Sequence, residues 1–409
     1  MTDFCATQGL LTLEQALAQI SDNLPENNAY ERLSLKNSLN RITFTDITSG
    51  INIPSFRNSS MDGYALQSHD QQKDTLKVVG TSWAGKPFTR AVNEGECIRI
   101  FTGAYVPDDC DCVVMQENVS RIEETIKISA WPKQEENIRN IADDTQKGQV
   151  LLTKGKQLKP ADIGLLAACG IADVAVYKAI TVGFFSTGDE LVSMGSQLKL
   201  GQIFDSNRYT LHALLTEAGV TPVDMGVIPD NPSAVEAALL SASRDCDVII
   251  TTGGVSVGEA DFITDVLEKI GTVDLWKIAI KPGKPLVFGH IDKAAFFGLP
   301  GNPVSVMVTF QQIVIPALQK MMGYKKLQQA VTLQARTTET IKKQPGRIEF
   351  QRGLVENNKG ELIVRSTGGQ GSHMLSSMSK ANCLIVLDQT SGDVEKGQYV
   401  SIQLLGKNI

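Results

Sequence analysis

The fold of this chain is decided by the stretch Asp247-Val-Ile-Ile-Thr-Thr-Gly-Gly-Val-Ser-Val-Gly-Glu-Ala-Asp261. Val248–Ile250 is short, apolar and β-branched, which predicts a buried strand of a parallel sheet. A helical pattern follows from about Ala260, so the residues between form a turn from a strand into a helix. Such a turn leaves backbone N–H groups free at the positive end of the helix dipole, which suits phosphate. The turn residues expected to bind a phosphorylated ligand are Gly253, Gly254, Ser256 and Gly258.

The same turn carries two acids, Glu259 and Asp261, which would repel a bare phosphate. Carboxylates beside a phosphate cradle are explained if a divalent cation bridges the two. The alternative is a tight turn with two solvated acids.

The composition excludes several classes of protein. A chain of 409 residues is too long for one core, so several domains are expected. A net charge of −6 argues against a nucleic-acid binder that works through bulk charge. The seven cysteines lack a Cys-x-x-Cys pair and the four histidines lie far apart, so a structural zinc site is not expected. Reduced thiols in a cytoplasmic protein are the better interpretation.

The N-terminus has Asp3 but no basic start and no apolar segment, so a secretory signal is not expected. The most apolar stretch, Thr309–Leu318, is broken by Gln311, Gln312 and Pro316. The sequence therefore predicts a soluble cytoplasmic protein without a membrane-spanning segment.

The N-terminal half contains a helical pattern, then β-rich runs, then a second helical pattern. Thr12-x-x-Gln15 is a capping box that opens an amphipathic helix. Short β-rich runs follow Pro54, and Pro160 and Gly170 then frame another helix. We expect an N-terminal α/β domain in two segments, 1–46 and 139–178, with a β-rich domain, 47–138, inserted between them.

The C-terminal half begins with an alternation of strands and helices. This alternation predicts a parallel, doubly wound sheet domain over 179–327. After residue 327 the sequence again consists of short β-rich runs, which predicts a small β-barrel-like domain over 328–409. The fold class is therefore multidomain α/β plus all-β.

Several strands of the predicted sheet are followed by acids. Glu190 lies in the loop Ser186-Thr-Gly-Asp-Glu190, and Asp230 follows the next strand. In a doubly wound sheet these loops meet at one edge, together with Asp261. Three acidic loops on one edge indicate a shared Mg²⁺ and phosphate site, whereas unrelated helix-capping acids are the alternative.

Cations are predicted at the same edge. Lys281 and Lys284 belong to the loop Lys281-Pro-Gly-Lys-Pro285, whose prolines restrict the backbone, and Lys277 precedes it. Lysines held in this way suit a phosphate or another tetrahedral oxyanion, although a solvated turn is equally compatible. The next loop opens a helix with Asn302 as N-cap and Pro303 at the first position. The N-terminus of this helix could bind an anion, but ordinary helix capping explains the same residues equally well.

The ordered motifs of the chain resemble those of molybdopterin molybdenumtransferases, which include bacterial MoeA proteins and the E domains of molybdenum insertases such as gephyrin. The similarity begins with Pro54-Ser-Phe-Arg-Asn-Ser-Ser-Met-Asp-Gly-Tyr-Ala65 and covers essentially the whole chain. The other matching stretches are Arg99–Gly103, Ser186–Leu191, Thr252–Asp261, Ala279–Pro285, Gly298–Pro303, Gly346–Arg352 and Gly368–His373.

The resemblance implies a four-domain homodimer with a composite site. It implies an enzyme that binds adenylylated molybdopterin and molybdate, uses Mg²⁺, releases AMP and gives molybdenum cofactor. The implied partners are a molybdopterin adenylyltransferase and apo-molybdoenzymes or their chaperones. The implied catalytic residues are Asp62, Glu190, Asp230 and Asp261, the last three also as metal ligands. Besides the turn residues and lysines above, the implied substrate-binding residues are Thr102, Asp144, Ser186, Gly188, Pro300, Pro303 and Arg352.

Some positions depart from the family pattern. Arg57 stands where Asp is common, and Asn140-Ile-Ala142 replaces the usual Arg-Arg-Gly. Asp143 is therefore an alternative to Asp144 as the functional acid. A dinucleotide oxidoreductase would need a Gly-x-Gly-x-x-Gly turn after its first sheet strand, but the turn after Phe185 has a single glycine. A pure scaffold would keep the fold without the acids, which are present.

Overall fold

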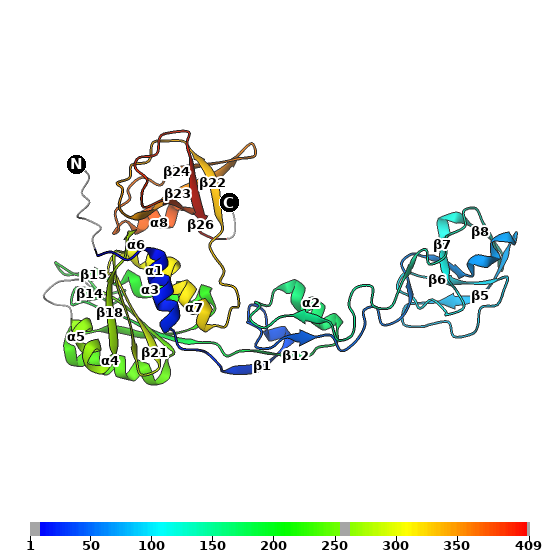
Figure 1. Ribbon diagram of the computed structural model, residues 1–409, viewed down its shortest axis with the longest axis horizontal. Coiled ribbons are helices and arrows are strands. Elements are labelled where there is room, and N and C mark those ends of the chain that lie inside the picture. Colours follow the sequence, from blue (N-terminus) through cyan, green and yellow to red (C-terminus); the bar gives the residue numbers. More distant parts are fainter. Residues whose placement is uncertain (1–8, 254–261, 407–409) are drawn as a thin grey trace. The chain divides into compact units, whose positions relative to one another are not determined.

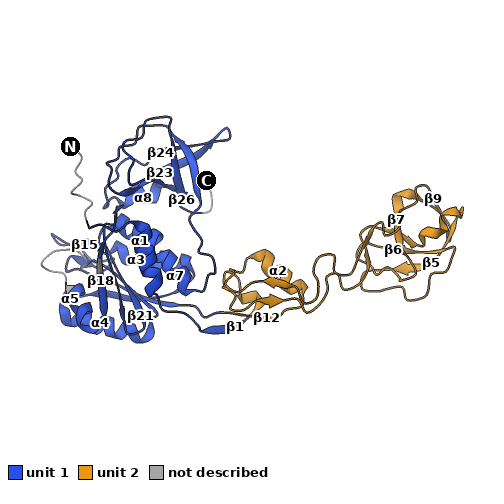
Figure 2. Ribbon diagram, viewed as in Figure 1, with its two compact units in different colours: residues 1–31, 177–409 blue, residues 32–176 orange. Residues whose placement is uncertain are grey.

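The computed structural model describes residues 9–253 and 262–406 of the chain (Figure 1). It divides into two compact units: unit 1 comprises residues 1–31 and 177–409, and unit 2 comprises residues 32–176 (Figure 2). In the part of the chain that the structure describes, no helix has the length and apolar character needed to cross a membrane. Four expected site residues lie outside the described residues: Gly254, Ser256, Gly258 and Asp261.

A six-stranded sheet with the order β16-β13-β17-β21-β20-β18 forms the centre of unit 1. The strands β16, β13, β17 and β21 are paired in parallel. The strand β20 runs antiparallel to both of its neighbours. The strands are β13 (Thr181–Thr187), β16 (Thr221–Ile228), β17 (Val248–Thr252), β18 (Thr272–Lys277), β20 (Pro285–Ile291) and β21 (Ala294–Leu299).

The strand β20 corrects the prediction of a parallel sheet. The prolines and glycine of Lys281–Pro285 indicated only a loop before the last strand. However, β18 and β20 are joined by residues 278–284, and β20 and β21 by residues 292–293. Links this short cannot hold a crossover helix, so β20 must run antiparallel to its neighbours. The sheet is therefore mixed, with a doubly wound parallel part.

Helices cover both faces of the sheet, which explains the apolar strands. On one face, Val182 and Phe184 pack with α3, α6 and α7. On the other, Phe185 and Ile249 pack with α4 and α5. Alternate residues of a strand point to opposite faces, so a strand covered on both sides is apolar throughout. The elements are α3 (Ser206–Ala218), α4 (Pro232–Asp245), α5 (Phe262–Ile270), α6 (Pro303–Thr309), the π-helical turn η5 (Phe310–Val314) and α7 (Ile315–Met321).

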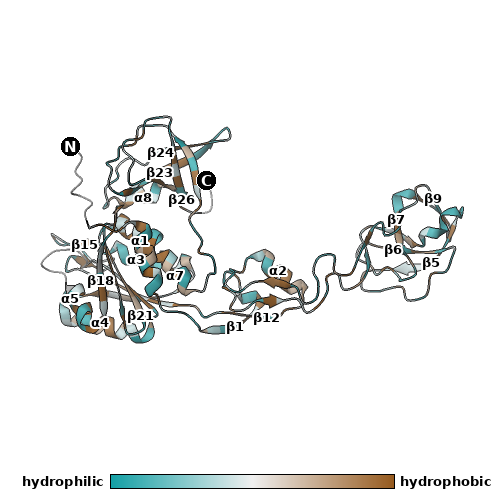
Figure 3. Ribbon diagram, in the orientation of Figure 1, coloured by the Kyte–Doolittle hydropathy of each residue, from teal (hydrophilic) through white to brown (hydrophobic). Residues whose placement is uncertain are grey.

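The first helix, α1 (Leu13–Asn23), begins with the predicted capping box. The Thr12 side chain accepts from the Gln15 backbone N–H, and the Gln15 side chain accepts from that of Thr12. The helix carries both apolar and polar stretches (Figure 3). Its buried residues pack in the core shared by the sheet, α6 and α7. We expected this helix to belong to one domain with residues 139–178. In the structure the apolar face of α1 packs against the sheet domain instead.

The C-terminal strands form the predicted barrel. Five strands pair in the order β23-β24-β22-β26-β25, and β25 pairs back with β23, so the sheet closes. The two-residue strand β19 (Ile280–Lys281) of the sheet domain pairs in parallel with the start of β23. The elements are β22 (Thr332–Thr337), β23 (Ile348–Asn358), β24 (Glu361–Ser366), α8 (Leu375–Lys380), β25 (Cys383–Leu387) and β26 (Tyr399–Leu404).

Unit 2 contains a β-rich part and a smaller α/β part. The first is a sheet with the order β7-β4-β6-β5-β9-β8. Its strands are β4 (Gly63–Leu66), β5 (Leu76–Ser82), β6 (Glu96–Ile100), β7 (Cys112–Met115), β8 (Val119–Ile122) and β9 (Thr125–Ile128). The second is built from β1 (Tyr30–Ser34), β2 (Ile47–Thr48), β11 (Val150–Leu152), α2 (Pro160–Ala168) and β12 (Asp173–Tyr177).

The smaller part joins residues that are far apart in the sequence. The strand β1 pairs with β12, and β2 pairs with β11. Leu35 shares a small core with Leu152, Leu166 and Val174. This arrangement is compatible with a β-rich insertion, although the exact domain boundaries stay a prediction. The short elements are η2 (Leu35–Asn37), β3 (Asn58–Ser59), η3 (Ser68–Gln72), η4 (Gln116–Asn118), β10 (Ile138–Arg139), β14 (Leu191–Val192) and β15 (Ile203–Phe204).

Candidate active site

A cavity of about 980 Å³ opens at the carboxyl ends of the parallel strands of unit 1. Thr187 ends β13, Gly253 follows β17, and Pro300 follows β21, and all three line the cavity. The barrel supplies another wall through Arg347 and residues 370–373. Ligands bind at this edge of open parallel sheets because the loops that follow neighbouring strands diverge there.

The floor of the cavity is a buried hydroxyl and carboxylate network. Ser186 Oγ donates to Asp205 Oδ1 at 3.2 Å and lies 2.9 Å from Thr252 Oγ1. Asp205 also accepts from the Arg208 backbone N–H, which caps α3. Ser186 is buried and does not line the cavity, although we expected it to bind substrate. In this structure it supports the residues that do.

The structure favours glycine at two expected positions. A Cβ atom on Gly253 would lie 2.8 Å from the Thr187 carbonyl oxygen, and φ of Gly253 is +89°. A Cβ atom on Gly188 would lie 2.6 Å from a carboxylate oxygen of Glu190. A side chain would clash with the backbone at Gly253, whereas at Gly188 the φ of +146° is what disfavours one, because the Glu190 carboxylate could move aside. Glu190 and Gly253 line the cavity, whereas Gly188 fixes the turn beside it.

Glu190 and Asp230 follow two neighbouring strands at this edge, although only Glu190 lines the cavity. Burial raises the pKa of Asp230, and the negative charges of Asp189 and Glu190 raise it further. These carboxylates are therefore close enough to repel one another. Among the described residues, no group of three potential ligands is arranged as a metal centre, and Asp261 falls outside them.

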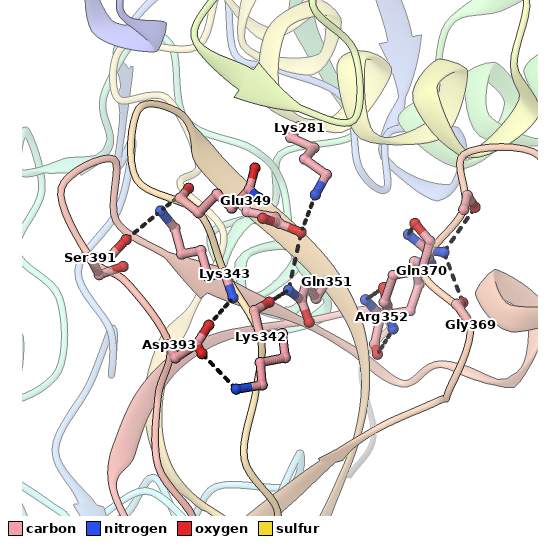
Figure 4. A network of polar contacts seen from close by, with 12 residues as sticks. Lys281, Lys342, Lys343, Glu349, Gln351, Arg352, Gly369, Gln370, Ser391 and Asp393 are labelled. Atoms are coloured by element: carbon pink, nitrogen blue, oxygen red, sulfur yellow. Dashed lines mark hydrogen bonds and ion pairs between the residues drawn. The ribbon is translucent and has the colours of Figure 1, made fainter. Parts of the chain in front are cut away.

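The lysine loop contributes two cations to the cavity. Lys281 and Lys284 line it, while Lys277 is exposed at the end of β18 and does not. The Lys281 ammonium lies 3.0 Å from Glu349 Oε1 (Figure 4). A Cβ atom on Gly283 would lie 2.5 Å from Thr309 Oγ1, and φ of Gly283 is +111°, so only glycine fits between the two lysines.

The loop before α6 lines the cavity with Pro300, Asn302 and Pro303. Pro303 opens the helix as predicted, but the Asn302 side chain makes no capping hydrogen bond. Asn207, at the start of α3, donates through Nδ2 to the Gly301 carbonyl oxygen at 2.7 Å. This contact fixes the loop to a second helix.

Arg352 lies behind the cavity wall (Figure 4). Its side chain is buried, and its guanidinium donates to the carbonyl oxygens of Gly369, Gln370 and Gly371. Burial lowers its pKa. We expected Arg352 to bind substrate, but in this structure it does not line the cavity and instead holds the loop that does.

Unit 2 contains the remaining expected residues. Asp62 accepts from the Thr102 backbone N–H and hydroxyl, each at 2.8 Å. These hydrogen bonds, with the charge of Arg99, lower the pKa of Asp62. Asp143 accepts from the Asn140 backbone N–H at 2.6 Å, and Asp144 is exposed. Asp62 and Thr102 therefore contact each other, and their role in a site stays a prediction.

Sequence reasoning missed several cavity residues. The signal for Asn207 was its place in the first turn of a helix after a sheet strand. The signal for the barrel wall was the glycine-rich run before His373, which was noted without selecting a residue. The missed lining residues with polar side chains are Thr187, Asp205, Ser206, Asn207, Thr252, Ser305, Arg347, Gln370, Ser372 and His373.

Three family models match the chain in order. They are the MoeA N-terminal region (domain I and II) at residues 11–170, a probable molybdopterin-binding domain at 183–320, and the MoeA C-terminal region (domain IV) at 334–405. A molybdopterin molybdenumtransferase of Haemophilus influenzae is 48% identical over 96% of this chain and 98% of that protein. The chain belongs to the molybdopterin molybdenumtransferase family.

Two further proteins are similar to almost the whole of this chain. Gephyrin of Dictyostelium discoideum is 36% identical over 94% of this chain and 60% of its own length. The crystal structure of a molybdopterin biosynthesis MoeA protein from Pyrococcus horikoshii has a TM-score of 0.84 at 30% identity. It covers 97% of this chain and 100% of its own. The predicted family and fold class are confirmed.

Replacing Arg352 with lysine should loosen the cavity wall. A lysine cannot donate to three carbonyl oxygens from a planar fork, so buried acceptors lose their partners. We expect Arg352→Lys to lower the free energy of unfolding by about 2–5 kcal/mol. Urea denaturation and hydrogen exchange of the 369–371 amides measure the effect. The control is Arg336→Lys, because Arg336 pairs with Glu361 at the exposed surface of the same barrel. Equal losses in both variants would contradict the role given to Arg352.

Replacing Asp230 with asparagine should stabilise the ligand-free protein at neutral pH. Folding raises the pKa of this carboxyl above its ordinary value, 3.8. Its ionised form therefore opposes folding above the folded-state pKa, and that cost disappears below the unfolded-state pKa. Asp230→Asn should raise the thermal midpoint at pH 7, with the gain fading near pH 3. Asp224→Asn on the same strand should do the opposite, because Asp224 pairs with Arg208 at 3.1 Å. A lower midpoint for Asp230→Asn at pH 7 would refute the repulsion.

Proposed function

We propose that this protein is a Mg²⁺-dependent transferase that inserts molybdenum from molybdate into adenylylated molybdopterin, hydrolysing the adenylate and releasing AMP. The observation that carries the proposal is one cavity with acids on one wall and cations on another. Glu190 lies on the sheet side, and Lys281, Lys284 and Arg347 lie in the lysine loop and the barrel. Such a cavity can bind an anion through the cations while the acids hold a divalent cation.

The cations would bind the phosphate and molybdate oxygens. Lys281 and Lys284 are held on both sides of Gly283, so their positions are restricted before a ligand arrives. Fixed donors around developing negative charge lower the barrier to phosphate cleavage without reorganisation. The Gly253 turn, which must stay free of a side chain, leaves its backbone accessible to a phosphate.

The acids fit a resident Mg²⁺. Burial and, to a smaller extent, the charges of Asp189 and Glu190 raise the pKa of Asp230, and a bound cation would relieve that repulsion. Mg²⁺ is commonly held by one or two carboxylates together with substrate phosphates, so Glu190 and Asp230 would suffice with Asp261 as a further ligand. When bound, the ion would neutralise charge on the cleaved phosphate. Hydrogen bonds from Ser186 keep Asp205 turned to the cavity floor, apart from this role.

The surroundings of the reaction follow from its chemistry. A molybdopterin adenylyltransferase would supply the substrate, and apo-molybdoenzymes or their chaperones would receive the product. The proposed location is the cytoplasm, which the reduced thiols inferred from the sequence favour. Activation of an apo-molybdoenzyme by the reaction mixture would give a second readout beside AMP release.

Glu190→Gln should reduce molybdate-dependent AMP release by about a hundredfold, because it removes a charge that would hold Mg²⁺. Chelation of Mg²⁺ should have a similar effect on the wild type. Purified protein with adenylylated molybdopterin, molybdate and Mg²⁺ provides the assay. The matched control is Glu236→Gln, because Glu236 pairs with Lys269 in helices outside the cavity. Near-normal turnover of Glu190→Gln, or turnover without Mg²⁺, would exclude the metal role.

The proposed enzyme is a homodimer in which Asp62 and Thr102 of one chain serve the cavity of the other. The Thr102 hydrogen bonds lower the pKa of Asp62, and its exposed carboxylate suits a role in binding. Mixing Asp62→Ala chains with Glu190→Gln chains should restore about a quarter to a half of the wild-type activity, because a heterodimer keeps one intact site. AMP release after demonstrated subunit exchange measures this. No recovery would indicate a site within one chain.

A further inference from the structure

Glu349 of the barrel pairs with a lysine of the cavity (Figure 4). Lys281 and Glu349 are direct partners in the parallel pairing of β19 with β23. The Lys281 ammonium lies 3.0 Å from Glu349 Oε1, and the side chains are 47% and 6% exposed. The cation thus faces the cavity, and its carboxylate partner is buried behind it.

Other charges and donors surround the carboxylate of Glu349. Gln351 Nε2 donates to Glu349 Oε1 at 3.1 Å and to the Lys342 carbonyl oxygen at 2.8 Å. Lys343 is buried, which lowers its pKa, and its ammonium donates to the Ser391 carbonyl oxygen at 2.9 Å. The charges of Glu349 and Asp388 oppose that shift, whereas those of Lys281 and Arg347 reinforce it. The Glu349 carboxylate therefore lies near three basic residues, Lys281, Lys343 and Arg347.

The ion pair has to persist when a ligand binds. A buried carboxylate without a partner is strongly destabilising, so a ligand that pulled Lys281 away from Glu349 would be opposed by that cost. An ammonium has three N–H donors, so Lys281 can bind Glu349 with one and an anion with the others. The backbone pairing of β19 with β23 keeps the two residues together.

We propose that Glu349 is a positioning residue that holds Lys281 at the cavity wall and, as a built-in counter-charge, weakens the attraction of the cavity for anions. The inference rests on the proposed function, because it takes the cavity to bind molybdate and AMP. A cavity with uncompensated cations would retain AMP and delay the next turnover. Glu349 lowers this affinity while Lys281 stays in place, so the barrel adjusts anion release from the sheet domain.

A purely structural ion pair predicts a different result. Loss of a structural pair would reduce stability and would leave anion affinity unchanged or weaker. Loss of a counter-charge should strengthen anion binding. The substitution Glu349→Gln separates these outcomes, because glutamine can still accept a hydrogen bond from Lys281 but carries no charge.

The test measures the dissociation constants of molybdate and of AMP, separately, for the wild-type protein and Glu349→Gln. A unit charge within about 7 Å, at effective dielectric constants of about 20 to 80, predicts a three- to fiftyfold tighter complex. In turnover, both kcat and KM should fall. The control is Asp393→Asn, which also removes one negative charge from the barrel; Asp393 pairs with the exposed Lys342, away from the cavity. This control should change both affinities less than twofold.

A second pair of variants uses Lys281→Ala with and without Glu349→Gln. The single variant leaves Glu349 buried without its ammonium partner, so its thermal midpoint should fall. The double variant should recover part of that midpoint and bind AMP more tightly than the single variant. This comparison remains decisive if Glu349→Gln alone does not fold.

The outcomes distinguish this inference from the proposed function. A wild-type protein that binds neither anion and releases no AMP refutes the proposed function. A wild type that binds and turns over, with equal or weaker binding in Glu349→Gln, overturns the counter-charge alone. Equal tightening in Asp393→Asn would also overturn it, because the effect would then belong to net charge.

Discussion

The backbone pairing of β19 with β23 is the interaction on which the site depends. It joins two residues of the sheet domain to the start of the barrel strand β23, at Ile280–Ile348 and Lys281–Glu349. The barrel thereby supplies a wall to a cavity whose other walls are loops at the carboxyl ends of sheet strands. Without that wall, an edge that every doubly wound sheet presents would remain an open crevice.

Acidic and basic side chains lie on different walls of this cavity. Among the acids that follow the strands, burial raises the pKa of Asp230, and the charges of Asp189 and Glu190 raise it further. Cations from the lysine loop and the barrel face the cavity, and Glu349 is buried behind one of them. Asp205, in contrast, accepts through Oδ1 from Ser186 and from the first turn of α3, and its Oδ2 lies 3.4 Å from Arg208 Nε. Acids at the same edge therefore differ in role because their neighbours differ.

Local sequence signals predicted much of the framework. The capping box of α1, the apolar strand β17 and the closed C-terminal barrel are all present. The antiparallel strand β20 was missed because Lys281–Pro285 has the composition of a turn. The helix α1 was grouped with residues 139–178, and its apolar face packs in the core of the sheet domain. Both points concern contacts between elements, which depend on link length and on where an apolar face finds its partner.

The sequence by itself determined the family, the alternation that builds the sheet, and the residue types that gather at its edge: acids, lysines and glycines. Tertiary structure alone decided which of them face the cavity. Lys281 and Lys284 do, Lys277 does not, and Arg352 holds a loop from behind. The pairing of Lys281 with Glu349 joins residues 68 positions apart through strands of different domains. Periodicity and spacing report local geometry, whereas the burial and charge partners of a side chain are set by long-range packing that no single segment encodes.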